Sequence, residues 1–353
     1  MTGFKSYFWI YISTYCLLFV FTFDIPFTIF PKINTFLNPF FQNLVYWSGT
    51  EIFGLKNTFN TIITSDSIGL YIHVFNLSYV SFILSSLWYL LLNNKGVNLR
   101  KYFVIISSYY TALHLLMYGF DKIFKAQFFI PEPNTLFTNL GELTPDLLYW
   151  STIGSSWSYS TFLGLSEVII ACLLLFYRTR LIGTILGIVL MVNVVSVNFS
   201  FNISVKIFSC FLLGILILNI IPFATYLYNV LIIKIPANFK REKITLFTKN
   251  KFIIKGIKCI VILSFFGESL LPYIKSKNYN DDTSPRPIFH GAYNVNTASK
   301  NEILQNWKQV FIHRKGYFIV KNKENIMQDF QLNIDTNNQV LELNNYSNNQ
   351  IYT

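Results

Sequence analysis

Seven long apolar runs constrain this chain more than any other feature of its sequence. A run of about 18 to 25 apolar residues is long enough to cross a bilayer as a helix. Such runs cover residues 8–30, 69–92, 102–124, 161–177, 180–200, 203–221 and 252–272. Only 13% of the residues are charged, against about a quarter in soluble domains. The sequence therefore predicts an all-α polytopic membrane protein with about seven transmembrane helices.

The basic residues predict how these helices are oriented. If the N-terminus is cytoplasmic, fourteen lysines and arginines lie in the inner segments and five in the outer loops and helix ends. Cytoplasmic loops carry such an excess of positive charge. The net charge of +11 is explained in this way, without the clustered basic stripe that nucleic acid binding requires. We therefore expect the bilayer as partner, no nucleic acid, and a C-terminal tail on the far side.

The chain divides by composition into three segments. Residues 1–68 hold the first helix and an aromatic, amide-rich stretch suited to the membrane interface. Residues 69–272 hold the helix bundle, including a Pro-, Gly- and Trp-rich cap over residues 126–160. Residues 273–353 alternate apolar and polar positions between Asn and Asp turns, which is the period of strands. The tail is thus expected to be a small β-rich extramembrane domain that packs against the cap.

Polar residues inside the apolar runs form the candidate site, because a charge at bilayer depth is expensive and is usually kept for a function. With the predicted topology, these residues all fall in the outer half of the bundle: His114, Lys122, Lys125, Gln127, Glu167, Asn193, Asn198 and Lys206. A carboxylate at that depth needs a cation or a proton. We expect Glu167 to pair with Lys206 or with Lys122.

Each of these residues also has a purely structural interpretation. The lysines could extend to the interface from helix ends, and a buried ion pair can serve packing alone. His114 could be an interior hydrogen-bonded histidine, and the asparagines could join neighbouring helices. The four histidines are too dispersed for a haem or an H-E-x-x-H metal site, so no metal is expected.

Short motifs around these residues resemble those of a known family. Gly119 and Lys122 form a Gly-x-x-Lys pattern, and Gly164 and Glu167 form a Gly-x-x-Glu pattern. The stretch GELTPDLLYW over residues 141–150 lies between these two patterns. Together they resemble the DoxX family of bacterial membrane proteins, in particular a long subgroup from Bacteroidetes with extra helices and a polar C-terminal domain.

The resemblance implies a four-helix core over about residues 102–221 and a place in the bacterial inner membrane, with the C-terminal domain periplasmic. Some members of the family are similar to the small subunit of thiosulfate:quinone oxidoreductase, and others associate with oxidoreductases. We therefore expect a quinone- or small-anion-binding subunit of a membrane oxidoreductase system, with a periplasmic or membrane oxidoreductase as partner and quinone as the candidate cofactor.

The expected roles follow from the residue types. Glu167 and His114 are the catalytic candidates, with Glu167 balancing charge or moving a proton. The other candidates bind or orient the ligand: Lys122, Lys125, Gln127, Asn193, Asn198 and Lys206. A non-enzymatic alternative stays open, in which the chain is a membrane scaffold subunit whose C-terminal domain docks a periplasmic partner.

Overall fold

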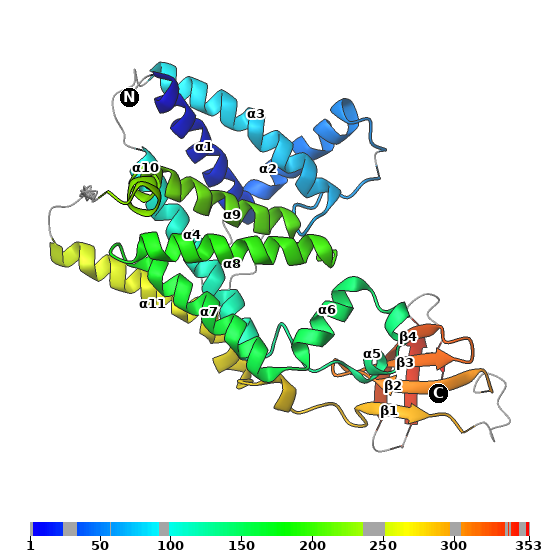
Figure 1. Ribbon diagram of the computed structural model, residues 1–353. Helices are drawn as coiled ribbons and strands as arrows, with labels where there is room; N and C mark the ends of the chain where they lie inside the picture. The colour runs from blue at the N-terminus through cyan, green and yellow to red at the C-terminus, as the bar shows by residue number, and fades with distance from the viewer. Residues whose placement is uncertain are drawn as a thin grey trace. The chain divides into compact units, whose positions relative to one another are not determined.

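The protein divides into two compact units in a computed structural model (Figure 1). The membrane unit comprises Met1–Ile123 and Phe162–Lys277, and the sheet unit comprises Phe124–Thr161 and Asn278–Thr353. The structure describes residues 3–23, 34–56, 58–91, 99–235, 251–296, 305–335, 338, 340–345 and 351–352. The predicted cap and the predicted tail therefore belong to the same unit, although they are far apart in the sequence.

Six helical spans are long and apolar enough to cross a membrane. They are Ile68–Leu91 (α3), Arg100–Ile123 within α4 (Leu99–Ile123), Trp157–Leu175 (α7), Arg180–Ser200 (α8), Lys206–Ile233 and Phe252–Thr283. The fifth span contains α9 (Lys206–Ile220) and α10 (Ala224–Tyr228), and the sixth contains α11 (Lys251–Ser276) except its first residue. The expectation of a polytopic α-helical membrane protein is confirmed.

The first predicted helix is shorter than its apolar run. Helix α1 spans Gly3–Thr22 and is followed by a bend at Phe23, so it ends well before residue 30. The sequence Asp24-Ile25-Pro26 follows directly, and proline disfavours a helical conformation at the residue before it. Helix α2 (Asn34–Trp47) contains Pro39 and continues into a single wide turn over Ser48–Ile52.

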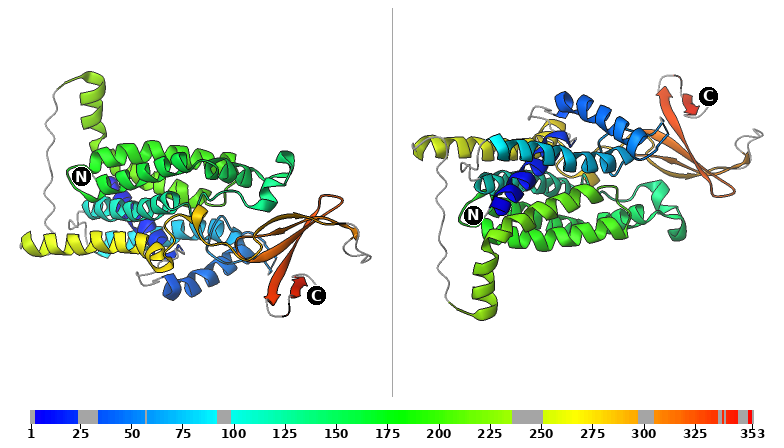
Figure 2. Two further views of the ribbon diagram at one scale, coloured as in Figure 1. Left: turned by 90° about the horizontal axis from the view of Figure 1, so that it is seen from below. Right: turned by 90° about the horizontal axis from the view of Figure 1, so that it is seen from above.

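Apolar side chains from several helices form the core of the membrane unit. Leu70, Leu116, Leu174 and Leu216 are fully enclosed, and each comes from a different helix. Helix α8 packs beside α9, α1 beside α3, and α4 beside α11, and the neighbouring green ribbons of α8 and α9 can be followed in Figure 2. Most of the remaining helix surface is apolar and exposed, as a lipid-facing surface requires.

The sheet unit contains one six-stranded antiparallel meander in which sequential strands are neighbours. Its strands are β1 (Gly291–Asn294), β2 (Trp307–Ile312), β3 (Tyr317–Asn322), β4 (Met327–Asp335), β5 (Val340–Asn345) and β6 (Ile351–Tyr352). Phe318 pairs with Ile312 on β2 and with Phe330 on β4. These three buried side chains form a small core with Val320 and Leu343. The predicted β-rich domain is confirmed.

The opposite face of the sheet is contacted by α5 (Pro133–Leu136) and the residue after it, Phe137, which precede α6 (Pro145–Gly154) in the chain. Phe311 and Ile319 are buried on this face, and the rings of Phe311 and Phe137 lie 5.8 Å apart. The Lys321 Nζ atom donates to the Phe137 carbonyl oxygen at 2.7 Å. With apolar side chains buried on both faces, the small sheet is packed on both sides, as the expected contact between tail and cap requires.

Candidate functional site

Two glycines set the closest approach of helices α4 and α7. A Cβ atom built on Gly164 would lie 2.5 Å from the Gly119 carbonyl oxygen, and one built on Gly119 would lie 2.9 Å from the Gly164 carbonyl oxygen. No larger residue fits at either position without moving a backbone. Small residues serve the same purpose wherever two membrane helices meet closely.

The ion pair follows from this crossing. Lys122 and Glu167 each lie three residues after one of the glycines, and helical side chains tilt back toward the start of their own helix. Both side chains therefore reach the level where the two backbones touch. The Lys122 Nζ atom donates to both carboxylate oxygens of Glu167, at 2.9 and 2.8 Å. Of the two expected partners of Glu167, the structure selects Lys122.

The pair is buried and stands beside a second carboxylate. Lys122 is 8% and Glu167 4% exposed. Asp121 interacts electrostatically with both of them and accepts a hydrogen bond from the Tyr273 hydroxyl on α11. The Lys122 Nζ atom also lies 5.6 Å from the centre of the Tyr118 ring. One lysine and two carboxylates thus share a mostly enclosed place inside the bundle, with one formal negative charge in excess.

His114 lies in an aromatic environment instead. Its ring centre is 4.5 Å from that of Tyr110 and 4.9 Å from that of Phe208, in both cases edge to face. Tyr118 lies next along the same helix, with its ring centre 6.4 Å from that of His114. The side chain is buried. The Tyr118 ring lies between it and the Lys122 ammonium, and its expected catalytic role remains a prediction.

Lys206 pairs with a residue that the sequence analysis did not single out. Its Nζ atom lies 3.6 Å from the Asp66 carboxylate and 2.9 Å from the Asn202 side-chain oxygen. Asp66 also accepts from the backbone N–H groups of Lys206 and Ile207, at 2.9 and 3.1 Å. A carboxylate at the first turn of a helix compensates its unpaired donors and its dipole. Lys206 therefore belongs to a cap of α9 and is not a partner of Glu167.

Lys125 and Gln127 belong to the sheet unit. Lys125 has a positive φ of 61° directly after α4, and its fully buried side chain donates to the Gly154 carbonyl oxygen at 2.5 Å. Its Nζ atom also lies 3.3 Å from the Asp282 carboxylate. The Gln127 side-chain oxygen is enclosed without a hydrogen-bond partner among the described residues.

The two asparagines of α8 lie on different sides of that helix. Asn198 is 5% exposed, whereas Asn193 is exposed. The structure thus brings together Lys122 and Glu167 out of the expected set, and it leaves Asn193 on the outer surface of the bundle. Positions five residues apart point in directions that differ by about 140° on an α-helix.

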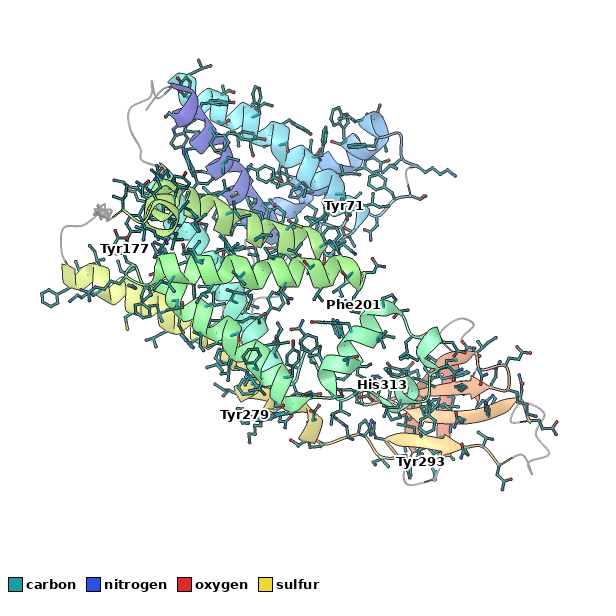
Figure 3. All side chains as sticks on the ribbon, in the orientation of Figure 1. Tyr71, Tyr177, Phe201, Tyr279, Tyr293 and His313 are labelled. Carbon is teal, nitrogen blue, oxygen red and sulfur yellow. The ribbon has the colours of Figure 1, made fainter. Side chains whose placement is uncertain are left out.

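A second polar cluster lies in the sheet unit around Glu132, near His313, which Figure 3 labels. Glu132 is 5% exposed and accepts hydrogen bonds from the backbone N–H of Arg314 at 3.0 Å and from His290 Nε2 at 3.1 Å. Arg314 forms an ion pair with Asp281 and lies over the Phe129 ring, 4.2 Å from its centre. We call these residues, with His313, the Glu132 cluster.

Burial lowers the pKa of His313 in this cluster, and the Glu132 carboxylate opposes that shift. His313 Nε2 lies 3.9 Å from the carboxylate. Burial likewise lowers the pKa of Arg314. The cluster joins the cap to the strands, since Glu132 comes from the segment before α5 and Arg314 from the turn between β2 and β3.

Within the described ranges, no group of three or more His, Cys, Asp or Glu side chains could hold a metal ion. Asp66, Tyr273 and Glu132 are the polar partners that sequence reasoning missed. Glu132 and Asp66 lie in loops, where no apolar run marks them as unusual, and Tyr273 follows Pro272 near the end of an apolar helix.

No family model and no solved structure matches the chain. The uncharacterized protein YwoB of Bacillus subtilis (strain 168) is 30% identical to it over 133 residues. The match covers 34% of this chain and 79% of YwoB. Since more than two thirds of YwoB is covered at this identity, the chain belongs to the same family as YwoB.

Proposed function

We propose that the chain is a DoxX-like membrane subunit that binds a quinone beside the Lys122–Glu167 pair. The observation that carries this proposal is a buried ion pair between two membrane helices, with a second carboxylate and two tyrosines next to it. Ionisable groups at membrane depth usually mark ligand sites or proton relays. The aromatic residues of α4 and α11 around the pair suit a flat apolar ring.

Charge balance favours a quinone over a small anion. Both oxygens of Glu167 already accept hydrogen bonds from the Lys122 ammonium, and Asp121 adds a further negative charge nearby. A second anion would be repelled at such a place, because Coulomb repulsion is strong in a medium of low dielectric. A quinone carries no charge, and its reduction to a quinol takes up two electrons and two protons.

The chain's own residues would handle the protons. The Tyr273 hydroxyl donates to Asp121, so this pair can pass a proton on and take up another. When Glu167 takes up a proton, its attraction for Lys122 weakens. Lys122 can then donate a hydrogen bond to a quinone oxygen. The electrons would come from an oxidoreductase partner in the membrane or in the periplasm, which places the chain as a subunit and not as a complete enzyme.

The proposed location is the bacterial inner membrane, with the N-terminus cytoplasmic and the sheet unit periplasmic. The distribution of basic residues supports this orientation. Fusing a periplasm-dependent reporter such as alkaline phosphatase after Tyr352 should give an active reporter, and fusing it after Tyr177 should not. Activity at Tyr177 alone would reverse the orientation.

Quinone content tests the ligand. The full chain would be purified in mild detergent, extracted with organic solvent and assayed for quinone by chromatography. We expect quinone to co-purify with the wild type and to fall at least tenfold in Lys122→Met and in Glu167→Gln. Lys206→Met is the matched control, because this lysine pairs with Asp66 at the start of α9. Equal quinone in all four proteins, or none in the wild type after supplementation with ubiquinone or menaquinone, would reject the proposal.

The competing function is a non-enzymatic scaffold whose sheet unit docks a periplasmic partner. Strand β1 favours it, because β1 ends the sheet on one side and three of its four residues are exposed. An open edge can pair with a strand of another protein. Replacing the exposed Ala292 on β1 by proline would remove a backbone donor from this open edge, because Val295 and therefore Tyr293 use their N–H groups toward β2. Loss of a stoichiometric partner in this variant, with normal growth of Glu167→Gln cells, would favour the scaffold.

A further inference from the structure

Asn193 stands apart from the other asparagines of the membrane helices. Asn76, Asn198 and Asn219 are all buried, and Asn76 and Asn219 accept hydrogen bonds from Ser48 and Ser107. Asn193 is exposed, and its amide makes no hydrogen bond to any residue that the structure describes. A hydrogen-bonding partner for this amide must therefore come from outside the described chain.

The position of Asn193 makes an unpaired amide costly. Helix α8 spans Arg180–Ser200, between Tyr177 and Phe201, which are labelled in Figure 3. Asn193 lies seven residues before the end of this helix, about 10 Å along its axis, and so inside a hydrocarbon layer of about 30 Å. Water does not reach that depth to satisfy an amide. Serines on these helices avoid this problem, since the half-buried Ser166 and the exposed Ser196 donate to carbonyl groups of their own helices.

The residues around Asn193 form a seam suited to another helix. The exposed positions Ile182, Leu186, Val189, Asn193 and Ser196 are spaced alternately four and three residues apart along one face of α8. This spacing is the seam of a left-handed helix pair. The other face is already occupied, with Gly183 packed against Leu173 and Gly187 against Leu216.

We propose that two copies of this chain associate through the seam of α8, with Asn193 of one copy hydrogen-bonded to Asn193 of the other. A second copy is the occupant because a primary amide carries both donors and an acceptor and is therefore its own complement. Across a twofold axis, equivalent residues on the axis face one another. Lipid tails offer neither donor nor acceptor at this depth. The association does not depend on the quinone proposal, since it uses another face of another helix.

Subunit association in lipid bilayers tests the proposal. Full-length chains with donor and acceptor dyes would be mixed in liposomes, and energy transfer would be measured as the lipid-to-protein ratio rises. We expect a dimer whose dissociation constant rises about tenfold in Asn193→Leu, as the loss of interhelical amide hydrogen bonds in a membrane predicts. Asn193→Gln should restore most of the affinity, because it keeps the amide.

Two controls make the outcome decisive. Ser166→Leu also replaces a polar residue, here a half-buried one, on a membrane helix, and it should leave the dimer unchanged because Ser166 bonds within α7. Val189→Cys copies, in a background without the four native cysteines, should cross-link with each other under mild oxidation, whereas Ser166→Cys copies should not. A monomeric wild type at every lipid ratio, an unchanged dimer in Asn193→Leu, or a Val189→Cys cross-link to a different protein would overturn the proposal.

Discussion

Glu167 in the membrane unit and Glu132 in the sheet unit are equally buried, but they are stabilised in different ways. Glu167 is 4% exposed, and both of its oxygens accept from one lysine. Glu132 is 5% exposed and accepts from a backbone N–H group and a histidine, with the Arg314 guanidinium 3.7 Å away. A charge on a membrane helix cannot use backbone donors, because the helix itself consumes them. The membrane carboxylate thus depends on a single partner.

The largest expected effect comes from removing that single partner. Lys122→Met should lower the free energy of unfolding by about 3–5 kcal/mol, because it leaves a buried carboxylate uncompensated. The double variant Lys122→Met/Glu167→Leu should recover most of this loss, since a well-packed apolar pair can replace a buried ion pair. Unfolding in detergent, followed by circular dichroism, measures both. A double variant as unstable as the single one would show that the pair contributes more than charge compensation.

A somewhat smaller effect is expected from the glycine crossing that brings the pair together. Gly164→Ala places a methyl group 2.5 Å from the Gly119 carbonyl oxygen and should cost about 3 kcal/mol, as overpacking does. It should also separate Lys122 from Glu167. Gly214→Ala is the control, because open space surrounds Gly214 on α9 and alanine favours a helix. Similar unfolding temperatures for the two variants would contradict the proposed role of the crossing.

The sheet unit should tolerate the equivalent change better. Glu132→Gln removes the charge but keeps one oxygen that can accept from the Arg314 backbone, so we expect a loss of about 1.5 kcal/mol. Hydrogen exchange of the β2 and β3 amides reports the stability of this unit by itself. If Glu132→Gln lowers the free energy of unfolding as much as Lys122→Met does, a carboxylate with several partners is no more tolerant of change than one with a single partner.

The smallest effect is a dependence of the sheet unit on pH. Burial lowers the pKa of His313 in the folded protein, whereas an unfolded histidine titrates near 6.5. Below about pH 6.5 the unfolded chain takes up a proton that the folded chain does not, so stability that is present above this pH is lost as the pH falls. Exchange of the β2 and β3 amides should therefore accelerate from pH 7.5 to 5.5, after correction for intrinsic rates. His313→Gln should reduce this acceleration.

The sequence was sufficient to predict the membrane helices and the tail strands, because both depend on local periodicity. Residues 180–200 are helical as predicted. The short polar sequence Arg178-Thr179-Arg180 marks the start of this helix, and a turn follows its end. The alternating pattern of the tail likewise predicted strands. Neither prediction required knowledge of distant contacts.

The choice of partner for Glu167 could not be predicted, because it depends on which helix faces meet. The other expected partner, Lys206, pairs instead with Asp66, a loop residue that no apolar run marks. The separation of Asn193 from Asn198 was within reach of the sequence, since helical geometry alone places them on different sides. The glycine crossing was visible as two motifs, but its steric reason required the backbone.

The sheet unit is assembled from two stretches that the ribosome delivers at different times. The 116 residues from Phe162 to Lys277 separate the cap from the first tail residue. At a synthesis rate of about 5–20 residues per second, these residues alone take about 6 to 23 seconds, and only afterwards can Asp282 pair with Lys125 and Phe311 contact Phe137. Throughout that interval the apolar and charged groups of the cap lack their final partners. The sheet unit can therefore fold only after the last membrane helix, α11, has been synthesised.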